Sequence, residues 1–124
     1  MVAKKYDVVW TKRSQQHMEQ IFSYINEQSP QNALQVTEDI ILAVNKATTN
    51  PEIYNPYKYK HNNDGTYRAF EKHRYRISYR YKTNVIRVLR VRHSSMEPKE
   101  YWFFYTYKIQ ITNPGFYIFL RTTI

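Results

Sequence analysis

The spacing of apolar residues changes once along this chain, and the change sets the fold class. In residues 12–28, apolar side chains recur every three or four positions, at Met18, Ile21 and Ile25, which places them on one face of a helix. In residues 66–92, apolar and polar side chains alternate, which is the period of a strand with one buried face. A helical half followed by a stranded half predicts an α+β domain.

A short strand and a second helix complete the predicted first half. Residues 6–10 are β-branched and aromatic, which favours a strand, and Thr11 stands at the expected N-cap of the helix that follows. The second helix begins with Ser29 as its cap and Pro30 at its first position, where a missing N–H costs nothing. Its apolar stripe extends to about Thr49. Because the connection between the two helices is very short, an antiparallel α-hairpin is predicted.

Three antiparallel strands are predicted in the second half, over residues 66–72, 75–81 and 85–92. Short polar turns separate them, so they form a β-meander. On the middle strand, tyrosine and isoleucine occupy one face, and arginine and serine occupy the other. We expect the two helices to cover the apolar face of this meander.

A loop and a C-terminal extension account for the rest of the chain. The loop, residues 51–65, includes the run 57–61, in which tyrosine alternates with lysine. This run either stacks on nucleic-acid bases or is a half-ordered loop. Residues 1–101 are expected to form one domain. Residues 102–124 are rich in aromatic side chains and are interpreted as an extra β-hairpin of the same domain, with a poorly ordered tail as the alternative.

Positive charge is concentrated in the predicted meander. The chain has 19 Lys and Arg against 10 Asp and Glu. Nine of the basic residues but one acid, Glu71, fall within residues 65–92. This asymmetry favours a polyanionic partner, such as nucleic acid, an anionic membrane or an acidic protein. The alternative is a solvated face that keeps the protein soluble.

Other features of the sequence exclude several classes of site. The chain has no cysteine, which excludes disulfides, thiolate zinc sites and a cysteine nucleophile. It has no cluster of metal ligands and no glycine-rich phosphate loop, so we expect neither a metal nor a cofactor. We see no apolar run that suits a signal peptide or a membrane span, and a cytoplasmic location is the expectation.

The basic meander suits the cleavage of RNA, in which the RNA's own 2′-hydroxyl is the nucleophile. Such a site needs a base, an acid and cations that stabilise charge on the phosphate. The candidate catalytic set combines one cation, Arg76, with four residues that could transfer protons: His93, Tyr101, Glu71 and His73. The expected phosphate-binding residues lie on the same or the adjoining strands, and we expect them beside Arg76: Arg68, Lys72, Arg74, Arg80, Arg90 and Arg92.

Several segments also carry a family resemblance. They are Val9-Trp10-Thr11, Ser29-Pro30, Tyr75-Arg76-Ile77-Ser78-Tyr79, and Arg90-Val91-Arg92-His93 with Pro98 and Tyr101. In this order they resemble the RelE/ParE superfamily, which comprises the toxin halves of type II toxin–antitoxin pairs. The resemblance covers about residues 5–101 and implies that superfamily's fold.

The resemblance implies two alternative activities. RelE-type toxins cleave mRNA in the ribosomal A site and so inhibit translation, and in that case Arg76 would stabilise the transition state. Arg68 stands where RelE has a lysine, and Tyr101 stands near its tyrosine, but Phe70 replaces a second lysine and no arginine occurs in residues 94–97. ParE-type toxins instead bind and poison DNA gyrase without a catalytic site. The sequence alone favours the metal-independent endoribonuclease, with the gyrase poison as the alternative and a non-toxic interaction module as a third.

Each activity implies its own partners. In every case we expect a cognate antitoxin, a small acidic protein that lays an amphipathic helix on the toxin. Operator DNA is then an indirect partner, through the antitoxin. The ribosome and mRNA, or DNA gyrase in the alternative, are the expected targets, and no membrane partner is expected.

Overall fold

The computed structural model describes residues 5–96, and it begins with the predicted strand and helix. Strand β1 spans Asp7–Trp10, and helix α1 spans Lys12–Asn26. Thr11 is the N-cap between them, because its Oγ1 accepts a hydrogen bond from the Ser14 backbone N–H at 3.1 Å. The predicted strand, cap and helix are all confirmed.

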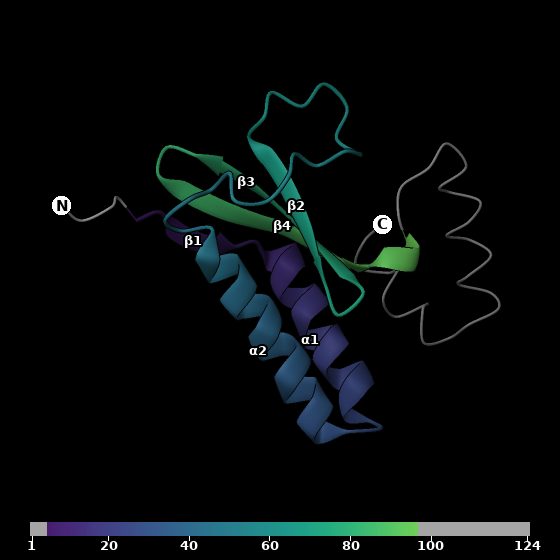
Figure 1. Cartoon of the computed structure of the whole chain (residues 1–124). Coiled ribbons are helices and arrows are strands. Elements are labelled where there is room, and N and C mark those ends of the chain that lie inside the picture. The colour runs from purple at the N-terminus through teal and green to yellow at the C-terminus, as the bar shows by residue number, and fades with distance from the viewer. Residues whose placement is uncertain (1–4, 97–124) are drawn as a thin grey trace.

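Helix α2 spans Pro30–Lys46 and lies antiparallel to α1 (Figure 1). Ser29 is its N-cap and accepts from the Asn32 backbone N–H at 3.2 Å, and Pro30 occupies the first turn, as predicted. The helix ends three residues before the expected Thr49, where the backbone turns toward the following loop. None of the helices in the described residues is long and apolar enough to cross a membrane.

The meander is also confirmed, with β2 at Tyr67–Lys72, β3 at Tyr75–Lys82 and β4 at Val85–His93. A short 3₁₀ turn, residues 94–96, follows β4. Both hairpins turn through pairs of residues with positive φ, which matches the right-handed twist of the strands. The predicted hairpin within residues 102–124 lies outside the described residues.

The predicted strand β1 joins this meander as a fourth strand, and the sequence pattern did not indicate that it would pair with β4. The strand order is β1-β4-β3-β2, and β1 runs parallel to β4, with Asp7 opposite Val85 and Trp10 opposite Val88. The helical hairpin connects β1 to the meander and covers one face of the sheet (Figure 1). The fold is therefore a mixed four-stranded sheet with two helices on one side.

The core lies between the helices and this covered sheet face. Ile21 of α1, Ile40 of α2 and Ile77 of β3 are fully buried in it. His17 is also buried, and its Nδ1 accepts a hydrogen bond from the Val91 backbone N–H at 3.1 Å, which ties α1 to β4. The opposite sheet face, which we call the outer face, points away from the helices.

The loop 51–65 covers the edge of β2 that the sheet leaves free. Ala69 N donates to Asn55 O at 3.1 Å, and Tyr57 N donates to Tyr67 O at 2.9 Å. Pro56 sits between these contacts in an antiparallel bridge to Arg68. Because an unpaired strand edge is a template for aggregation, the loop protects β2. It also brings its tyrosines and lysines next to the sheet.

Candidate functional site

Cross-strand register assigns each basic residue of the meander to a face of the sheet. Ile77 and Tyr79 belong to the core, so the residues opposite them on β2 and β4 face the helices. The residues between these positions face outward. Three cross-strand rows form the outer face: Tyr67–Arg80–Arg87, Ala69–Ser78–Arg90 and Glu71–Arg76–Arg92.

A β-bulge in β4 turns two of these arginines outward. Ser78 lies opposite Arg90, whereas its neighbour Tyr79 lies opposite Val88, so Leu89 is an extra residue in β4. Strict alternation from Val88 would point position 90 toward the helices. The bulge reverses the alternation, so that Arg90 and Arg92 face outward and Val91 fills the core. The outer face therefore owes part of its charge to this single extra residue.

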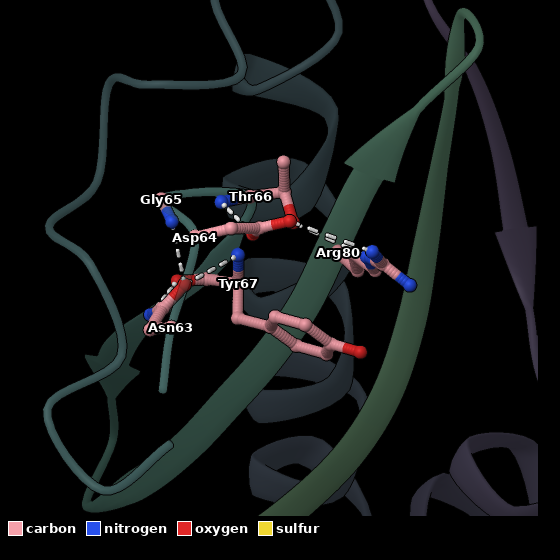
Figure 2. A network of polar contacts seen from close by, with 6 residues as sticks. All are labelled: Asn63, Asp64, Gly65, Thr66, Tyr67 and Arg80. Atoms are coloured by element: carbon pink, nitrogen blue, oxygen red, sulfur yellow. Dashed lines mark hydrogen bonds and ion pairs between the residues drawn. The ribbon is translucent and has the colours of Figure 1, made fainter. Parts of the chain in front are cut away.

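Arg80 is held by a polar turn that precedes β2 (Figure 2). Its Nε donates to Thr66 Oγ1 at 3.2 Å, and its Nη2 lies 3.6 Å from Asp64 Oδ2. Asp64 in turn accepts from the Thr66 backbone N–H, and hydrogen bonds from Thr66 are the main reason that the pKa of Asp64 is lowered. Nearby, Asn63 Oδ1 accepts from two backbone N–H groups that fix the turn. The guanidinium of Arg80 is thus fixed in position on the outer face.

Aromatic rings and cations are interleaved at this side of the sheet. The Tyr67 ring contacts both Lys60 Nζ and Arg80 Cζ, each 4.7 Å from its centroid. The Tyr59 ring contacts Lys58 Nζ at 5.1 Å and Arg76 Cζ at 5.7 Å. These cation–π contacts place the predicted run 57–61 beside the arginines of the meander. Sequence reasoning left the role of this run open, because its position depends on where the loop crosses the edge of β2.

Arg76 has one described carboxylate near it, that of Glu71. The Arg76 Nη2 atom lies 3.9 Å from Glu71 Oε1 across the β2–β3 pair. Glu71 is half exposed, whereas the Arg76 side chain is 19% exposed. Both residues, members of the candidate catalytic set, are therefore neighbours on the outer face.

Arg90 lies close to another cation, Arg13 of α1. Burial, followed by the charge of Arg13, lowers the pKa of Arg90. No feature of the sequence indicated this contact, because residues 13 and 90 meet only when α1 packs against β4. Arg87 also lies on the outer face but was absent from the predicted binding residues. Its place between the apolar residues Ile86 and Val88 does indicate that it points to the opposite face from them.

Three predicted phosphate-binding residues do not lie on the outer face. Arg74 lies in the turn between β2 and β3 and lines a cavity on the helix side. Arg68 is opposite Tyr79 and Lys72 is opposite Tyr75, so both side chains belong to the helix-facing side. The expectation that they stand beside Arg76 is wrong, because β2 alternates with Phe70 in the core and Ala69 outward. Arg68 instead anchors the loop: its Nε donates to Gly65 O at 2.8 Å, and its Nη1 donates to Tyr54 O at 3.1 Å.

The predicted histidines lie at the other end of the sheet, on the helix side. His73 Nε2 lies 2.6 Å from Asp39 Oδ2 of α2, and this contact is the main reason that the pKa of Asp39 is lowered. The ring of His93 meets that of Tyr75 edge-on, with centroids 5.4 Å apart. Both histidines line a cavity of about 440 Å³ with Arg74, between the helices and the β2–β3 turn.

The candidate catalytic set is therefore divided between two places. Arg76 and Glu71 are on the outer face, whereas His73 and His93 are on the helix side. Tyr101 lies outside the described residues. Within residues 5–96, no group of three or more His, Cys, Asp or Glu side chains is placed to hold a metal ion.

We predict that His93 makes the fold less stable in mild acid. Burial, and then the charge of Arg74, lowers its pKa below the usual 6.5, while Glu71 opposes this shift. Its Nδ1 accepts from the Ser95 backbone N–H at 3.2 Å, which requires that nitrogen to be unprotonated. The unfolded chain therefore binds a proton near pH 6.5 that the folded chain resists, so stability falls as pH drops from 7 through that value. In urea unfolding at several pH values, the His93→Gln variant should lose less stability over this range; an unchanged slope would contradict the prediction.

Comparisons with known proteins agree with this architecture. The family model described as "ParE toxin of type II toxin-antitoxin system, parDE" matches residues 8–98. A solved structure described as "Chromosomal ParDE TA system from P. aeruginosa" contains a chain with a TM-score of 0.60 and 18% identity, over 73% of this chain and 98% of that one. No curated protein sequence matches. The family model matches the chain from β1 to the end of β4, and the fold is shared with a ParDE structure. The chain therefore belongs to the ParE toxin family of type II toxin–antitoxin systems, within the RelE/ParE superfamily.

Proposed function

We propose that this toxin acts by binding DNA gyrase and does not depend on a site that cleaves mRNA. The observation that carries the proposal is the separation of the two histidines from the arginines of the outer face. Membership of the ParE family supports it, since ParE-type toxins poison gyrase by binding. The ribonuclease favoured by the sequence alone becomes the competing outcome of the test.

Cleavage of RNA needs groups that work within reach of one phosphate. A general base or acid must come within about 2.6–3.2 Å of its proton, or act through one water. Among residues 5–96, Glu71 is the one member of the predicted proton-transfer set that shares a face with Arg76. By register, His93 faces the helices whereas Arg76 faces outward, and His73 lies in the turn between β2 and β3. This arrangement suits a surface that binds a negatively charged partner better than a site that transfers two protons.

The test is a supercoiling assay with purified toxin, relaxed plasmid, ATP and gyrase, without ribosomes. We expect micromolar toxin to block supercoiling, and toxin that has been mixed first with its antitoxin to have no effect. Unaffected gyrase at that concentration would contradict the proposal. A parallel assay of mRNA cleavage on ribosomes identifies the alternative: there, Arg76→Ala would slow single-turnover cleavage by at least ~100-fold, the scale of one lost electrostatic stabiliser.

We also propose a surface for the cognate antitoxin. Three large apolar side chains of α2 are exposed: Leu34 at 53%, Ile41 at 42% and Leu42 at 61%. Their spacing puts them on one stripe of the helix, and an amphipathic helix of an acidic antitoxin suits such a stripe. Expression of the toxin alone is expected to arrest growth, and co-expression of the neighbouring gene is expected to relieve the arrest. Normal growth on expression alone would favour the non-toxic interaction module.

A further inference from the structure

Two pairs of arginines face each other across neighbouring strands of the outer face. Arg80 lies opposite Arg87, and Arg76 lies opposite Arg92. Directly opposed like charges destabilise a sheet, because their side chains begin only about 5 Å apart. The Arg76–Arg92 pair does not by itself indicate a bound anion, because Arg92 is buried and Arg76 lies near Glu71. Arg87 is exposed, so the Arg80–Arg87 pair indicates that this part of the face is arranged for an anion that separates the charges.

Carboxylates of the described chain leave part of this charge uncompensated. Glu71 and Asp64 lie near Arg76 and Arg80. Within residues 5–96, no ion pair is found for Arg87, Arg90 or Arg13. Arg90 and Arg13 are close enough for the charge of one to disfavour that of the other. Arg87 and Arg90 of the outer face, with Arg13 of α1 close to Arg90, are therefore without a described carboxylate partner, and we call these three arginines the β4 cluster.

The aromatic rings beside the outer face indicate which kind of anion fits. A protein that binds single-stranded nucleic acid presents open ring faces on which bases stack. Here, Tyr67 is in contact with Lys60 and Arg80, and Tyr59 is in contact with Lys58 and Arg76. The rings are thus already used to position cations. Such a surface presents charge to phosphates and does not present rings to bases.

We propose that the outer face binds the phosphate backbone of duplex DNA, so that the toxin contacts DNA directly while it inhibits gyrase. The choice of DNA over another phosphate polymer rests on the proposed function, because gyrase acts on duplex DNA. The bulge in β4 is central to this surface, since it directs Arg90 outward beside Arg87. The binding is sequence-independent, because phosphate contacts do not distinguish bases.

The test measures binding of the full-length toxin to a labelled duplex of about 30 base pairs, without gyrase, as salt is raised from about 50 to 200 mM. Each phosphate contact contributes about −0.9 to the slope of log K against log salt. The double variant Arg87→Ala/Arg90→Ala is expected to make the slope less steep by about two, and to do so equally for duplexes of different sequence. Circular dichroism confirms that the variant is folded.

A matched control separates a defined surface from the general attraction of a basic protein to DNA. Lys46 lies in the last turn of α2, in the helical layer, and Lys46→Ala removes one charge away from the outer face. Its slope should stay that of the wild type. The proposal would be overturned if Lys46→Ala and the single variant Arg87→Ala made the slope of log K against log salt less steep by the same amount. Tighter binding to single-stranded DNA or RNA of the same sequence would also overturn it.

Failure of this inference and failure of the proposed function have different signatures. If the toxin blocks supercoiling but the double variant binds the duplex as the wild type does, the gyrase proposal stands and the DNA surface is wrong. If the wild type binds duplex DNA through the β4 cluster but supercoiling continues, the proposed function is wrong. When both proposals hold, the Arg87→Ala/Arg90→Ala toxin is expected to inhibit supercoiling to the same extent only at a higher concentration than the wild type.

Discussion

Replacing Tyr79 with alanine is expected to cost about 3–5 kcal/mol of unfolding free energy, the range for removing a buried aromatic side chain. Tyr79 is fully buried at the centre of β3 and is the largest fully buried side chain of the described residues. Its ring meets that of Tyr54 edge-on, 6.4 Å between centroids. Urea unfolding followed by circular dichroism measures the loss; a cost below about 1 kcal/mol would mean that the neighbouring residues fill the cavity.

The hydroxyl of Tyr79 makes a separate contribution that a second variant isolates. It donates a hydrogen bond to the carbonyl oxygen of Pro51, a buried residue at the start of the loop 51–65. Burial of the phenol also raises its pKa, so it remains a donor at any physiological pH. Tyr79→Phe keeps the ring but leaves the Pro51 carbonyl without this donor, which costs about 1–3 kcal/mol for a buried group. A loss as large as that of the alanine variant would show that the hydroxyl, and not the ring, dominates.

Arg68→Ala is expected to destabilise the fold by about 2–3 kcal/mol, because hydrogen bonds from a charged donor are stronger than neutral ones. The guanidinium of Arg68 joins both ends of the loop, through Gly65 O and Tyr54 O. Without it, the loop should detach from the edge of β2 before the domain unfolds. Hydrogen exchange should then become faster at Ala69 N and Tyr57 N, which donate hydrogen bonds between the loop and β2.

Arg68→Lys is the matched control, because it keeps the charge. A lysine cannot donate to two carbonyls with the fixed geometry of a guanidinium, so this variant should lose nearly as much stability as Arg68→Ala. Full rescue by lysine would indicate that the charge itself matters, as in a residue that binds phosphate. The experiment therefore distinguishes the anchoring role seen in the structure from the role that the sequence suggested.

Much of the fold was predictable, because local signals and long-range packing agree. Thr11 and Ser29 mark the two helix starts through caps that involve only neighbouring residues. The alternation along β3 gave the meander and its two faces, and Arg76 and Arg80 lie outward as predicted. The family resemblance, confirmed over residues 8–98, gave the superfamily and its architecture.

The site was harder to predict, because it depends on how strands are aligned. Arg68 and Lys72 are close to Arg76 along the chain, but a register that puts Phe70 in the core turns them toward the helices. Arg90 faces outward only because Leu89 is an extra residue in β4. His73 occurs in the same basic block as Arg76 and His93 directly follows that block, yet the β2–β3 turn and the end of β4 place them on the helix side. Neither charge counting nor alternation contains this information.

The parallel pairing of β1 with β4 has a consequence for the kinetics of folding. Each pair of partner residues, such as Trp10 and Val88, is 78 positions apart in the chain, and contacts of such high order form slowly. At about 5–20 residues per second, synthesis takes roughly 4–16 s to pass from one partner to the other. The outer face also takes Arg87 and Arg90 from β4, the last strand of the described sheet. The surface that we propose to bind DNA is thus complete only after β4 has left the ribosome, late in the synthesis of the domain.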